Sequence, residues 1–260
     1  MTRQKLGQHF LSDLSWRKRI LQTLRVARGE SWLEIGAGHG EMTELLARAG
    51  ARVMAIETDS QLAEGLAERS PAWGDVQVVP GDVLQLDLRA LAGDGARVYG
   101  NLPYYITSPI LRHLFAAADR IRSIDIVIQF EVAARIAAPP GRRAHGYLSA
   151  LCQFYAKPEI VLRIPPGAFR PPPEVTSALV SMTMPGERAT LGITDEPRFL
   201  EFLQTCFGQK RKTLRNNLRG LASAAEIEAA LQKSRIPPAA RAEELTLAQF
   251  AAMYDAMEKT

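Results

Sequence analysis

The sequence contains little cysteine and little histidine. Its 260 residues include only two cysteines, Cys152 and Cys206, which are too few for a disulfide framework. The four histidines are scattered along the chain without the spacing of metal ligands. No apolar run approaches the length of a membrane span, and residues 1–7 lack the apolar core of a signal peptide. The sequence therefore predicts a cytoplasmic protein that holds no metal and contacts no membrane.

The chain has only a small excess of positive charge, with 32 Lys and Arg against 28 Asp and Glu, but this charge is unevenly distributed. Residues 1–28 carry seven Lys or Arg and one acid, Asp13. Residues 209–219 carry five Lys or Arg and no acid. Two basic clusters in an otherwise balanced chain are typical of a polyanion contact, although an ordinary solvated surface explains them equally well.

Short apolar segments alternate with helical patterns over the first half of the chain. The predicted strands are 31–35, 52–56, 76–79, 97–99 and 124–129, and the helical patterns include 60–69, 108–118 and 130–138. This alternation predicts right-handed βαβ units and a mainly parallel sheet. A helix at 148–155 and strands at 159–164 and 176–184 are expected to follow, with the strands closing one edge of the sheet.

The pattern changes after residue 184. Pro185 and Gly186 interrupt the chain, and the later patterns are helical, at 196–206, 209–221, 224–234 and 246–257. The sequence therefore predicts an α/β domain over residues 1–184 and a small all-helical domain over residues 185–260.

Glycines or polar side chains follow four of the predicted strands. A glycine turn at 36–40 follows the first strand, Glu57 the second, Asp82 the third and Asn101 the fourth. In open parallel sheets the ligand crevice lies outside the carboxyl ends of the strands. We therefore expect these four segments to line one crevice.

The glycine turn favours a nucleoside ligand. Gly36 and Gly38 allow a tight turn and the close approach of a ligand to the main chain. The turn is followed by Glu41 and lacks the Gly-x-Gly-x-x-Gly spacing, so it suits a dinucleotide pyrophosphate poorly. Together with Glu34, this acidic rim favours a cationic ligand such as S-adenosylmethionine.

Two acids are placed to recognise such a ligand. Glu57 lies 21 residues after Gly36, at the position expected to accept hydrogen bonds from ribose hydroxyls. Asp82 is expected to accept a hydrogen bond from the adenine amine.

Residues 100–104, Gly-Asn-Leu-Pro-Tyr, have the groups needed to hold an aromatic amine. Asn101 Oδ1 and a main-chain oxygen near Leu102 and Pro103 can accept the two N–H groups, and Tyr104 offers a ring for stacking. Taken alone, the stretch is more typical of a turn that ends a strand. The other three strand ends favour the ligand-binding interpretation.

The basic segment is predicted to form one helix with two different faces. Arg211, Arg215 and Arg219 recur every four residues and would neutralise phosphates without reading sequence. The opposite face is apolar, with Phe207, Leu214, Leu218 and Leu221. A solvated helix face is the alternative.

Several motifs lie along the chain in a fixed order. They are 7–11 (Gly-Gln-His-Phe-Leu), 34–40 (Glu-Ile-Gly-Ala-Gly-His-Gly), Glu57, 81–82 (Gly-Asp), 101–104 (Asn-Leu-Pro-Tyr), 169–175 (Phe-Arg-Pro-Pro-Pro-Glu-Val), 207–218 (Phe-Gly-Gln-Lys-Arg-Lys-Thr-Leu-Arg-Asn-Asn-Leu) and 241–245 (Arg-Ala-Glu-Glu-Leu). In these motifs the chain resembles, over essentially its full length, the KsgA/RsmA family of ribosomal RNA adenine dimethyltransferases.

The resemblance implies a Rossmann-like class I S-adenosylmethionine-dependent methyltransferase sheet with a helical C-terminal domain. It also implies an activity, which is the dimethylation of N6 of two adjacent adenosines in the 3′-terminal loop of 16S rRNA. The partner would be the assembling small (30S) ribosomal subunit, and the enzyme is expected to be a monomer.

The resemblance further implies roles for individual residues. The cofactor would be bound by His9, Leu11, Gly36, Gly38, Glu57, Asp82 and Asn101. The catalytic group would be Asn101, Leu102, Pro103 and Tyr104, with Phe169 facing the target base from the other side. RNA would be bound by Lys210, Arg211, Lys212, Arg215 and Arg219. The chain departs from the family pattern at His39, Glu41 and Phe130, where Phe130 stands in place of the usual Lys.

Three alternatives remain at this point. A large-subunit rRNA dimethyltransferase would use the same chemistry, although residues 210–217 and 241–243 favour the small-subunit enzyme. An assembly or transcription factor could keep the fold without catalysis, and a nicotinamide-dependent oxidoreductase could share the glycine turn.

Overall fold

The computed structural model describes residues 9–258, and these form two compact units. The first contains residues 9–133 and 158–184, and the second contains residues 134–157 and 185–258. The sequence pattern predicts residues 134–157 in the first domain. In the structure this segment is bonded to the helical residues that follow 184, for example through Gly141 N to Glu243 O (2.8 Å) and Lys210 Nζ to Arg143 O (2.6 Å). Such links between distant segments leave no local pattern in the sequence.

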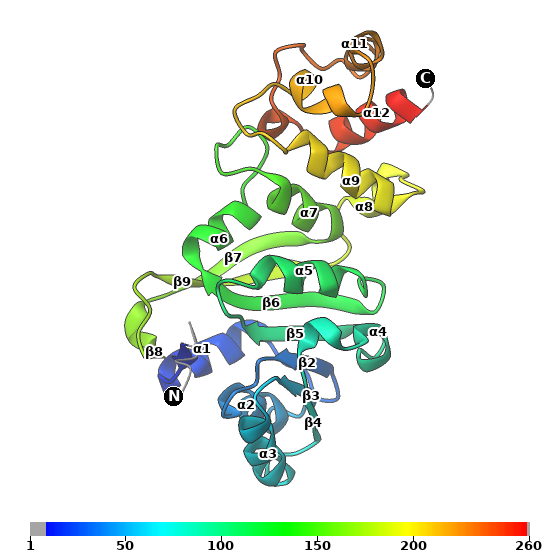
Figure 1. The fold of residues 1–260 in the computed structure, drawn as a ribbon. Helices are drawn as coiled ribbons and strands as arrows, with labels where there is room; N and C mark the ends of the chain where they lie inside the picture. The colour runs from blue at the N-terminus through cyan, green and yellow to red at the C-terminus, as the bar shows by residue number, and fades with distance from the viewer. Residues whose placement is uncertain (1–8, 259–260) are drawn as a thin grey trace. The chain divides into compact units, whose positions relative to one another are not determined.

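The first unit is built on a seven-stranded sheet with the order β4-β3-β2-β5-β6-β9-β7 (Figure 1). The strands are β2 (Ser31–Ile35), β3 (Arg52–Glu57), β4 (Val76–Pro80), β5 (Ala96–Asn101), β6 (Ile121–Gln129), β7 (Lys157–Ile164) and β9 (Ser177–Thr183). Strands β2 to β6 pair in parallel and β9 pairs antiparallel with β6. The mainly parallel α/β sheet predicted from the sequence is therefore confirmed.

A second, two-stranded sheet lies outside the main one. It joins β1 (Phe10–Leu11) to β8 (Phe169–Arg170) in an antiparallel pair. The chain continues from β1 into α1 (Leu14–Leu24), which Asp13 caps by accepting hydrogen bonds from two backbone amides. Residues 3, 5, 7 and 8, which belong to the basic N-terminal cluster and to the first motif, lie outside the described part of the chain.

Helices of the first unit cover the sheet with apolar side chains. They are α1, α2 (Glu41–Arg48), α3 (Ser60–Arg69), α4 (Leu88–Leu91), α5 (Thr107–Phe115) and α6 (Phe130–Ile136), whose last residues belong to the second unit. One hydrophobic core brings Ile20, Leu46 and Leu66 from three helices against Trp32 and Tyr99 of the sheet. This packing holds the carboxyl ends of the strands in a fixed arrangement.

The second unit is helical, with α7 (Tyr147–Tyr155), α8 (Arg188–Leu191), α9 (Glu196–Cys206), α10 (Leu214–Asn217), α11 (Ala224–Lys233) and α12 (Leu247–Glu258). Aromatic rings form its centre. The Phe199 ring lies 5.4 Å from the rings of both Phe154 and Tyr254. None of the helices in residues 9–258 is long and apolar enough to span a membrane.

The prediction of one helix over residues 209–221 is wrong. Residues 207–212 form turns, α10 has only four residues, and a 3₁₀ turn (Leu218–Gly220) follows it. Thr213 has an extended backbone and caps the start of α10, and the Asn217 side chain donates to Cys206 O at 2.6 Å at the end of α9. Arg211 is therefore not on a helix, and the predicted basic face does not exist in that form.

Candidate active site

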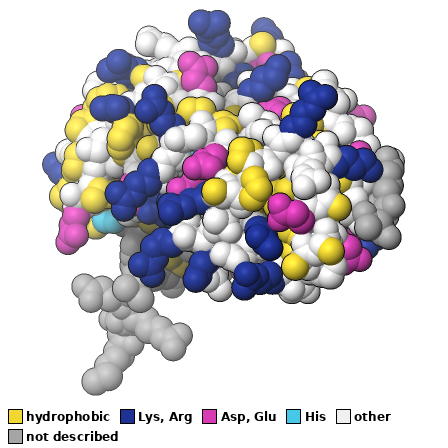
Figure 2. All heavy atoms as spheres, turned by 90° about the horizontal axis from the view of Figure 1, so that it is seen from above, with side chains coloured by type: hydrophobic (Ala, Val, Ile, Leu, Met, Phe, Trp, Pro, Cys, Tyr) yellow, Lys and Arg dark blue, Asp and Glu magenta, His cyan; other side chains and the backbone are white. Residues whose placement is uncertain are grey.

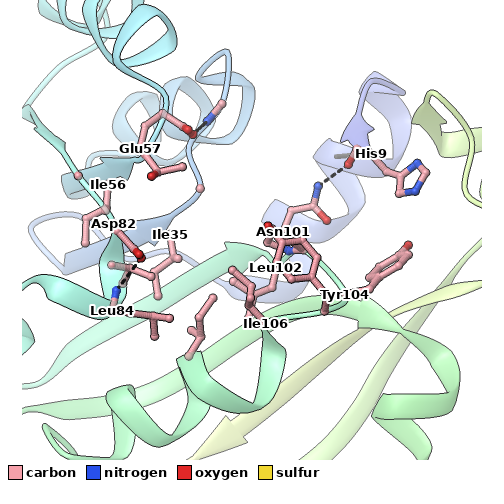
Figure 3. Close-up of a pocket in the computed structure, with 18 of the residues that line it drawn as sticks. His9, Ile35, Ile56, Glu57, Asp82, Leu84, Asn101, Leu102, Tyr104 and Ile106 are labelled. Carbon is pink, nitrogen blue, oxygen red and sulfur yellow. Dashed lines mark hydrogen bonds between the residues drawn. The ribbon is translucent and has the colours of Figure 1, made fainter. Parts of the chain in front are cut away.

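A cavity of about 300 Å³ opens at the carboxyl ends of β2, β3, β4 and β5. Its walls include Gly36, Glu57, Asp82 and Asn101, one from each of the four segments that the sequence analysis expected to converge. Figure 3 shows two ends to this cavity, with Glu57 and Asp82 at one and Asn101 and Tyr104 at the other. A ligand with two recognised parts would fit such an arrangement.

The glycine turn brings the main chain to the wall of the cavity. Gly36 and Gly38 have φ values of 71° and 58°, in the left-handed region that side chains rarely adopt. A Cβ atom at Gly38 would lie 3.1 Å from Cε1 of Phe10, which also lines the cavity. The Gly38 N–H donates to Glu57 Oε2 at 2.8 Å and links the turn to the end of β3.

Glu57 is buried and held by the main chain. Besides the bond from Gly38, its Oε1 accepts a hydrogen bond from Asp59 N at 2.9 Å. Each carboxylate oxygen has two lone pairs, so both can accept a further hydrogen bond from a ligand hydroxyl. Asp82 is exposed, and its Oδ1 accepts from Leu84 N at 3.0 Å.

The amide of Asn101 has a fixed orientation. Its Nδ2 donates to His9 O at 2.8 Å (Figure 3). A carbonyl oxygen can only accept a hydrogen bond, so the NH₂ group must face His9. Asn101 Oδ1 is therefore the atom of this amide that remains to accept hydrogen bonds from a ligand in the cavity.

The main-chain oxygens beside Asn101 differ in their surroundings. Pro103 O accepts a hydrogen bond from Ile106 N at 3.2 Å, which closes the turn before α5. Leu102 O accepts none from the described residues, whereas its N–H bonds to Val127 O at 3.1 Å and continues the strand pairing. Of these two main-chain oxygens, Leu102 O is thus the one that accepts no hydrogen bond from the described residues.

Tyr104 is held at both ends of its side chain. Its hydroxyl lies 2.8 Å from Ser177 Oγ in β9, and its ring stacks on His9 at 5.6 Å between centroids. The His9 ring is fixed in turn, because Nδ1 lies 2.8 Å from Pro171 O and must donate to it. Burial raises the pKa of Tyr104, so its hydroxyl stays protonated at neutral pH.

Glu34 does not contribute the negative charge that the sequence analysis assigned to it. Its side chain is only 3% exposed, and burial, with smaller contributions from Glu41 and Glu57, raises its pKa to about 8. Glu34 is therefore largely neutral at pH 7. It pairs across strands with Tyr99, and both line a small cavity of about 30 Å³ beneath the glycine turn.

Two predicted site residues do not line the main cavity. Phe169 has no exposed surface and belongs to the hydrophobic core, where its strand partner is Leu11. As placed here, its ring has no face open to a target base. Leu11 is also in the core and borders only the small cavity.

Sequence reasoning missed some of the residues that line the cavity. Phe10 and Tyr105 both contribute to its wall, and Tyr105 is 71% exposed. Each is the sequence neighbour of a predicted site residue, and that adjacency was the available signal. Apolar walls come from Ile56 and Leu84, which follow the periodicity of ordinary core residues.

The basic residues predicted to bind RNA are all exposed: Lys210, Arg211, Lys212, Arg215 and Arg219. Arg215 lies 3.7 Å from Glu228, whereas the other four form no ion pair with a described carboxylate. The face of the molecule shown in Figure 2 carries many Lys and Arg side chains and fewer Asp and Glu. Such a surface suits a polyanion.

The cavity fits S-adenosylmethionine by the chemistry of its walls. The glycine turn has no side chains that would keep a ligand away from the main chain. The Glu57 carboxylate can accept hydrogen bonds from a ribose. Ile56 and Leu84 offer apolar faces for an adenine ring, with Asp82 beside them. Among the described residues no group of His, Cys, Asp and Glu could hold a metal ion.

Solved structures define the class of this fold. A dimethyladenosine transferase from Plasmodium falciparum is 22% identical, with a TM-score of 0.79 over 96% of this chain and 98% of that chain. The 23S rRNA methyltransferase ErmE is 24% identical, with a TM-score of 0.70 over 96% and 99%. The fold is that of the class I S-adenosylmethionine-dependent methyltransferases.

The family follows from the sequence comparisons. The family model for ribosomal RNA adenine dimethylase matches residues 1–259, and the chain belongs to this family. A ribosomal RNA small subunit methyltransferase A from Acidobacterium capsulatum is 45% identical over 257 residues, covering 98% of this chain and 90% of the relative. One from Xanthomonas axonopodis pv. citri is 41% identical over 249 residues, covering 95% and 93%. This chain is an S-adenosylmethionine-dependent methyltransferase that dimethylates adenine in ribosomal RNA.

Proposed function

We propose that this enzyme dimethylates N6 of two adjacent adenosines in the 3′-terminal loop of 16S rRNA, in the assembling 30S subunit. Two relatives that are 45% and 41% identical carry the name of a small subunit methyltransferase. The observation that carries the chemistry is the orientation of Asn101, whose amide nitrogen is held by His9 O.

The cofactor end of the cavity is assigned to Glu57 and Asp82. Glu57 accepts the ribose hydroxyls, and Asp82 accepts the adenine amine between the apolar faces of Ile56 and Leu84. S-adenosylmethionine, when bound, supplies an electrophilic methyl group on a sulfonium centre. The neutral state of Glu34 removes one charge that would otherwise have to be buried without a partner.

The base end is assigned to Asn101 and Leu102. Asn101 Oδ1 and Leu102 O accept the two N–H groups of the target amine, whose lone pair is otherwise delocalised into the ring. Holding both hydrogens draws the nitrogen toward a tetrahedral shape and directs its lone pair toward the methyl group. Positioning and electrostatic stabilisation of the developing cation then lower the barrier.

No side chain is assigned as a general base, because the alkylated ammonium is strongly acidic. The monomethylated product has one N–H left, which either acceptor can hold. One acceptor is then released during the second transfer, and the amine can rotate to present its lone pair again.

Tyr104 is assigned to stack on the target base, which must leave its neighbours to enter the cavity. Its bond to Ser177 keeps the ring in place before the base arrives, which lowers the entropy lost on binding. In this arrangement Phe169 supports β1 from the core, and the second ring near the base is that of His9.

The basic residues 210–212 of the second unit are assigned to the rRNA backbone, together with Arg142 and Arg143. The bond from Lys210 Nζ to Arg143 O joins the two loops, so that exposed cations from distant segments lie together. These contacts fix position and contribute a salt-dependent share of affinity.

A methyl-transfer assay tests the proposal directly. Purified enzyme is incubated with labelled S-adenosylmethionine and with unmethylated small or large subunits, and the modified bases are mapped by primer extension. We expect two dimethylated adenosines in the 3′-terminal loop of 16S rRNA. Modification of large-subunit RNA, or of other positions in 16S rRNA, would overturn the proposed target. We also expect a monomer in the cytoplasm, which light scattering and cell fractionation check.

A further inference from the structure

Several exposed arginines of the first unit are already neutralised by acids. Ion pairs hold Arg48 to Glu44, Arg89 to Asp119, Arg120 to Asp94 and Arg122 to Glu30. Arg163 and Arg170 are exposed and form no ion pair with a described carboxylate, as is also the case for Arg25, Arg28 and Arg52. What sets these two apart is their location on one short segment, which pairs with Phe10 and continues to Pro171 beside His9.

Arg163 of β7 is held in place by an aromatic ring. Its guanidinium carbon lies 4.2 Å from the centre of the Phe130 ring, at the carboxyl end of β6. A cation over an aromatic face keeps its hydrogen-bond donors free at the rim of the guanidinium plane. Phe130 therefore orients a cation just beyond the carboxyl end of β6.

Arg170 neighbours a residue of the cavity wall, and Arg163 is linked to the wall through Phe130 and the start of β9. Phe130 N donates to Thr176 O, and the next residue, Ser177, holds the hydroxyl of Tyr104. Arg170 is the strand partner of Phe10, which lines the cavity.

The residue that follows Arg170 also contacts the site. Its next residue is Pro171, whose carbonyl oxygen holds the ring of His9. The segment 163–177 thus carries both cations and also two of the contacts that fix His9 and Tyr104.

We infer that Arg163 and Arg170 form a phosphate-binding rim, which holds the RNA backbone on either side of the nucleotide that enters the cavity. The ligand is a pair of phosphodiesters flanking an extruded adenosine, a geometry that needs cations close to the base site as well as on the second unit. This inference rests on the proposed function and deepens it. Its consequence is that RNA affinity near the reacting base is set by the first unit.

The matched comparison uses two double variants with the same change in net charge. Arg163→Gln with Arg170→Gln removes the proposed rim, and Arg48→Gln with Arg89→Gln removes two exposed arginines that are paired elsewhere in the unit. Methyl transfer to unmethylated small subunits is measured at several salt concentrations, after thermal unfolding has shown that both variants fold.

We expect the rim variant to raise KM several-fold with little change in kcat, because the contacts hold the strand rather than the reacting atoms. The dependence of log KM on log salt should fall by roughly 0.7 per lost contact, as for single-stranded RNA. The paired-arginine variant should match the wild type. Equal KM and equal salt dependence in the two double variants would overturn the inference.

A second variant tests how Arg163 is positioned. Phe130→Leu removes the ring beneath the guanidinium and should raise KM in the wild type but not in the Arg163→Gln background. An equal effect in both backgrounds would mean that Phe130 acts without Arg163 and would overturn this part. Failure of the wild-type enzyme to modify small subunits would instead refute the proposed function, so the two failures are distinguishable.

Discussion

The two ends of the main sheet carry cavities of almost equal size, about 300 Å³ at the carboxyl ends of the strands and about 290 Å³ at the amino ends. The first is lined by glycine turns and by acceptor side chains that follow the strands. The second is lined by the first residues of the same strands, such as Ser31, Arg52 and Gln77. Volume alone therefore does not define a site.

The difference lies in where the polar groups find partners. Near the amino ends, Arg52 of the cavity wall donates to Ser31 Oγ at 3.1 Å. Arg97 lies beside this wall without lining it, and pairs with Asp125 at 3.2 Å and with Glu30 at 3.5 Å. The charge of Arg97 is therefore neutralised by carboxylates of the protein itself. At the carboxyl ends, Asn101 uses only its donor within the described residues, and an acceptor remains for a ligand.

The largest effect is expected from Asn101→Ala, which removes the acceptor and its tether to His9. Transfer should fall by about 10³-fold, of the order seen when one preorganised group of an active site is lost. Cofactor affinity, measured by calorimetry, should fall but remain measurable. Gln77→Ala in the opposite cavity serves as the control and should leave turnover unchanged. Full activity in Asn101→Ala would refute the amine-acceptor role.

Asp125→Ala should separate stability from catalysis. It leaves the buried guanidinium of Arg97 without its closest carboxylate and also removes the acceptor of Ser181 Oγ at 2.7 Å. Loss of one partner of a buried pair costs roughly 3 to 5 kcal/mol of unfolding free energy. Chemical denaturation should show this loss, while kcat per folded molecule stays near that of the wild type. A selective loss of kcat would show that the far end also serves the reaction.

Glu34 gives the stability a pH dependence of a few kcal/mol. Its pKa is about 8 in the folded chain against 4.5 in the reference state, so the native state binds the extra proton between these values. This contribution is full below pH 4.5 and is lost as the pH rises toward 8. In Glu34→Gln the contribution is absent, and its stability relative to the wild type should increase between pH 5 and pH 8. Stability is measured by urea unfolding at each pH. A constant difference in unfolding free energy between the variant and the wild type would contradict the raised pKa of Glu34.

The smallest effect is expected from a pair of glycine substitutions with similar backbone angles. Gly38→Ala and Gly95→Ala both place a side chain at positive φ, 58° and 70°, which costs about 1 to 2 kcal/mol. Only Gly38 faces a close neighbour, with Phe10 at 3.1 Å, while nothing lies within 4 Å at Gly95. Both should lose similar stability, but only Gly38→Ala should weaken cofactor binding. Equal cofactor affinities in the two variants would show that the cofactor does not need the main chain at Gly38 to be free of a side chain.

Local patterns explain why much of this architecture could be predicted. The strands and the four segments after them follow from apolar periodicity and chain order, because parallel strands bring their carboxyl ends to one edge. Asn101 could be singled out for the same reason. Which way its amide faces could not, because that depends on a carbonyl 92 residues earlier in the chain.

The errors share one physical origin, which is that a residue's environment is set by distant segments. Arg211 has helical spacing from Arg215, but α10 begins only after Thr213, and its last residue Asn217 bonds to Cys206 O at the end of α9. Phe169 has an aromatic ring that could stack on a base. Its strand β8 pairs with β1, however, and this pairing places the ring in the core. Glu34 carries a formal charge in the sequence, and its burial removes that charge at neutral pH.

The two-residue pairing of β1 with β8 makes catalysis more fragile than the fold. The orientation of the Asn101 amide depends on His9 O, and the His9 ring is held by Pro171 O. His9 directly precedes β1 and Pro171 directly follows β8, so both contacts depend on this short pairing. Leu11 and Phe169 anchor the pair in the core, but only two residues of each strand are paired, so fewer main-chain hydrogen bonds hold it than hold the main sheet. Moderate heating or mild denaturant should therefore abolish methyl transfer while most backbone amides of β2 to β6 remain protected from hydrogen exchange.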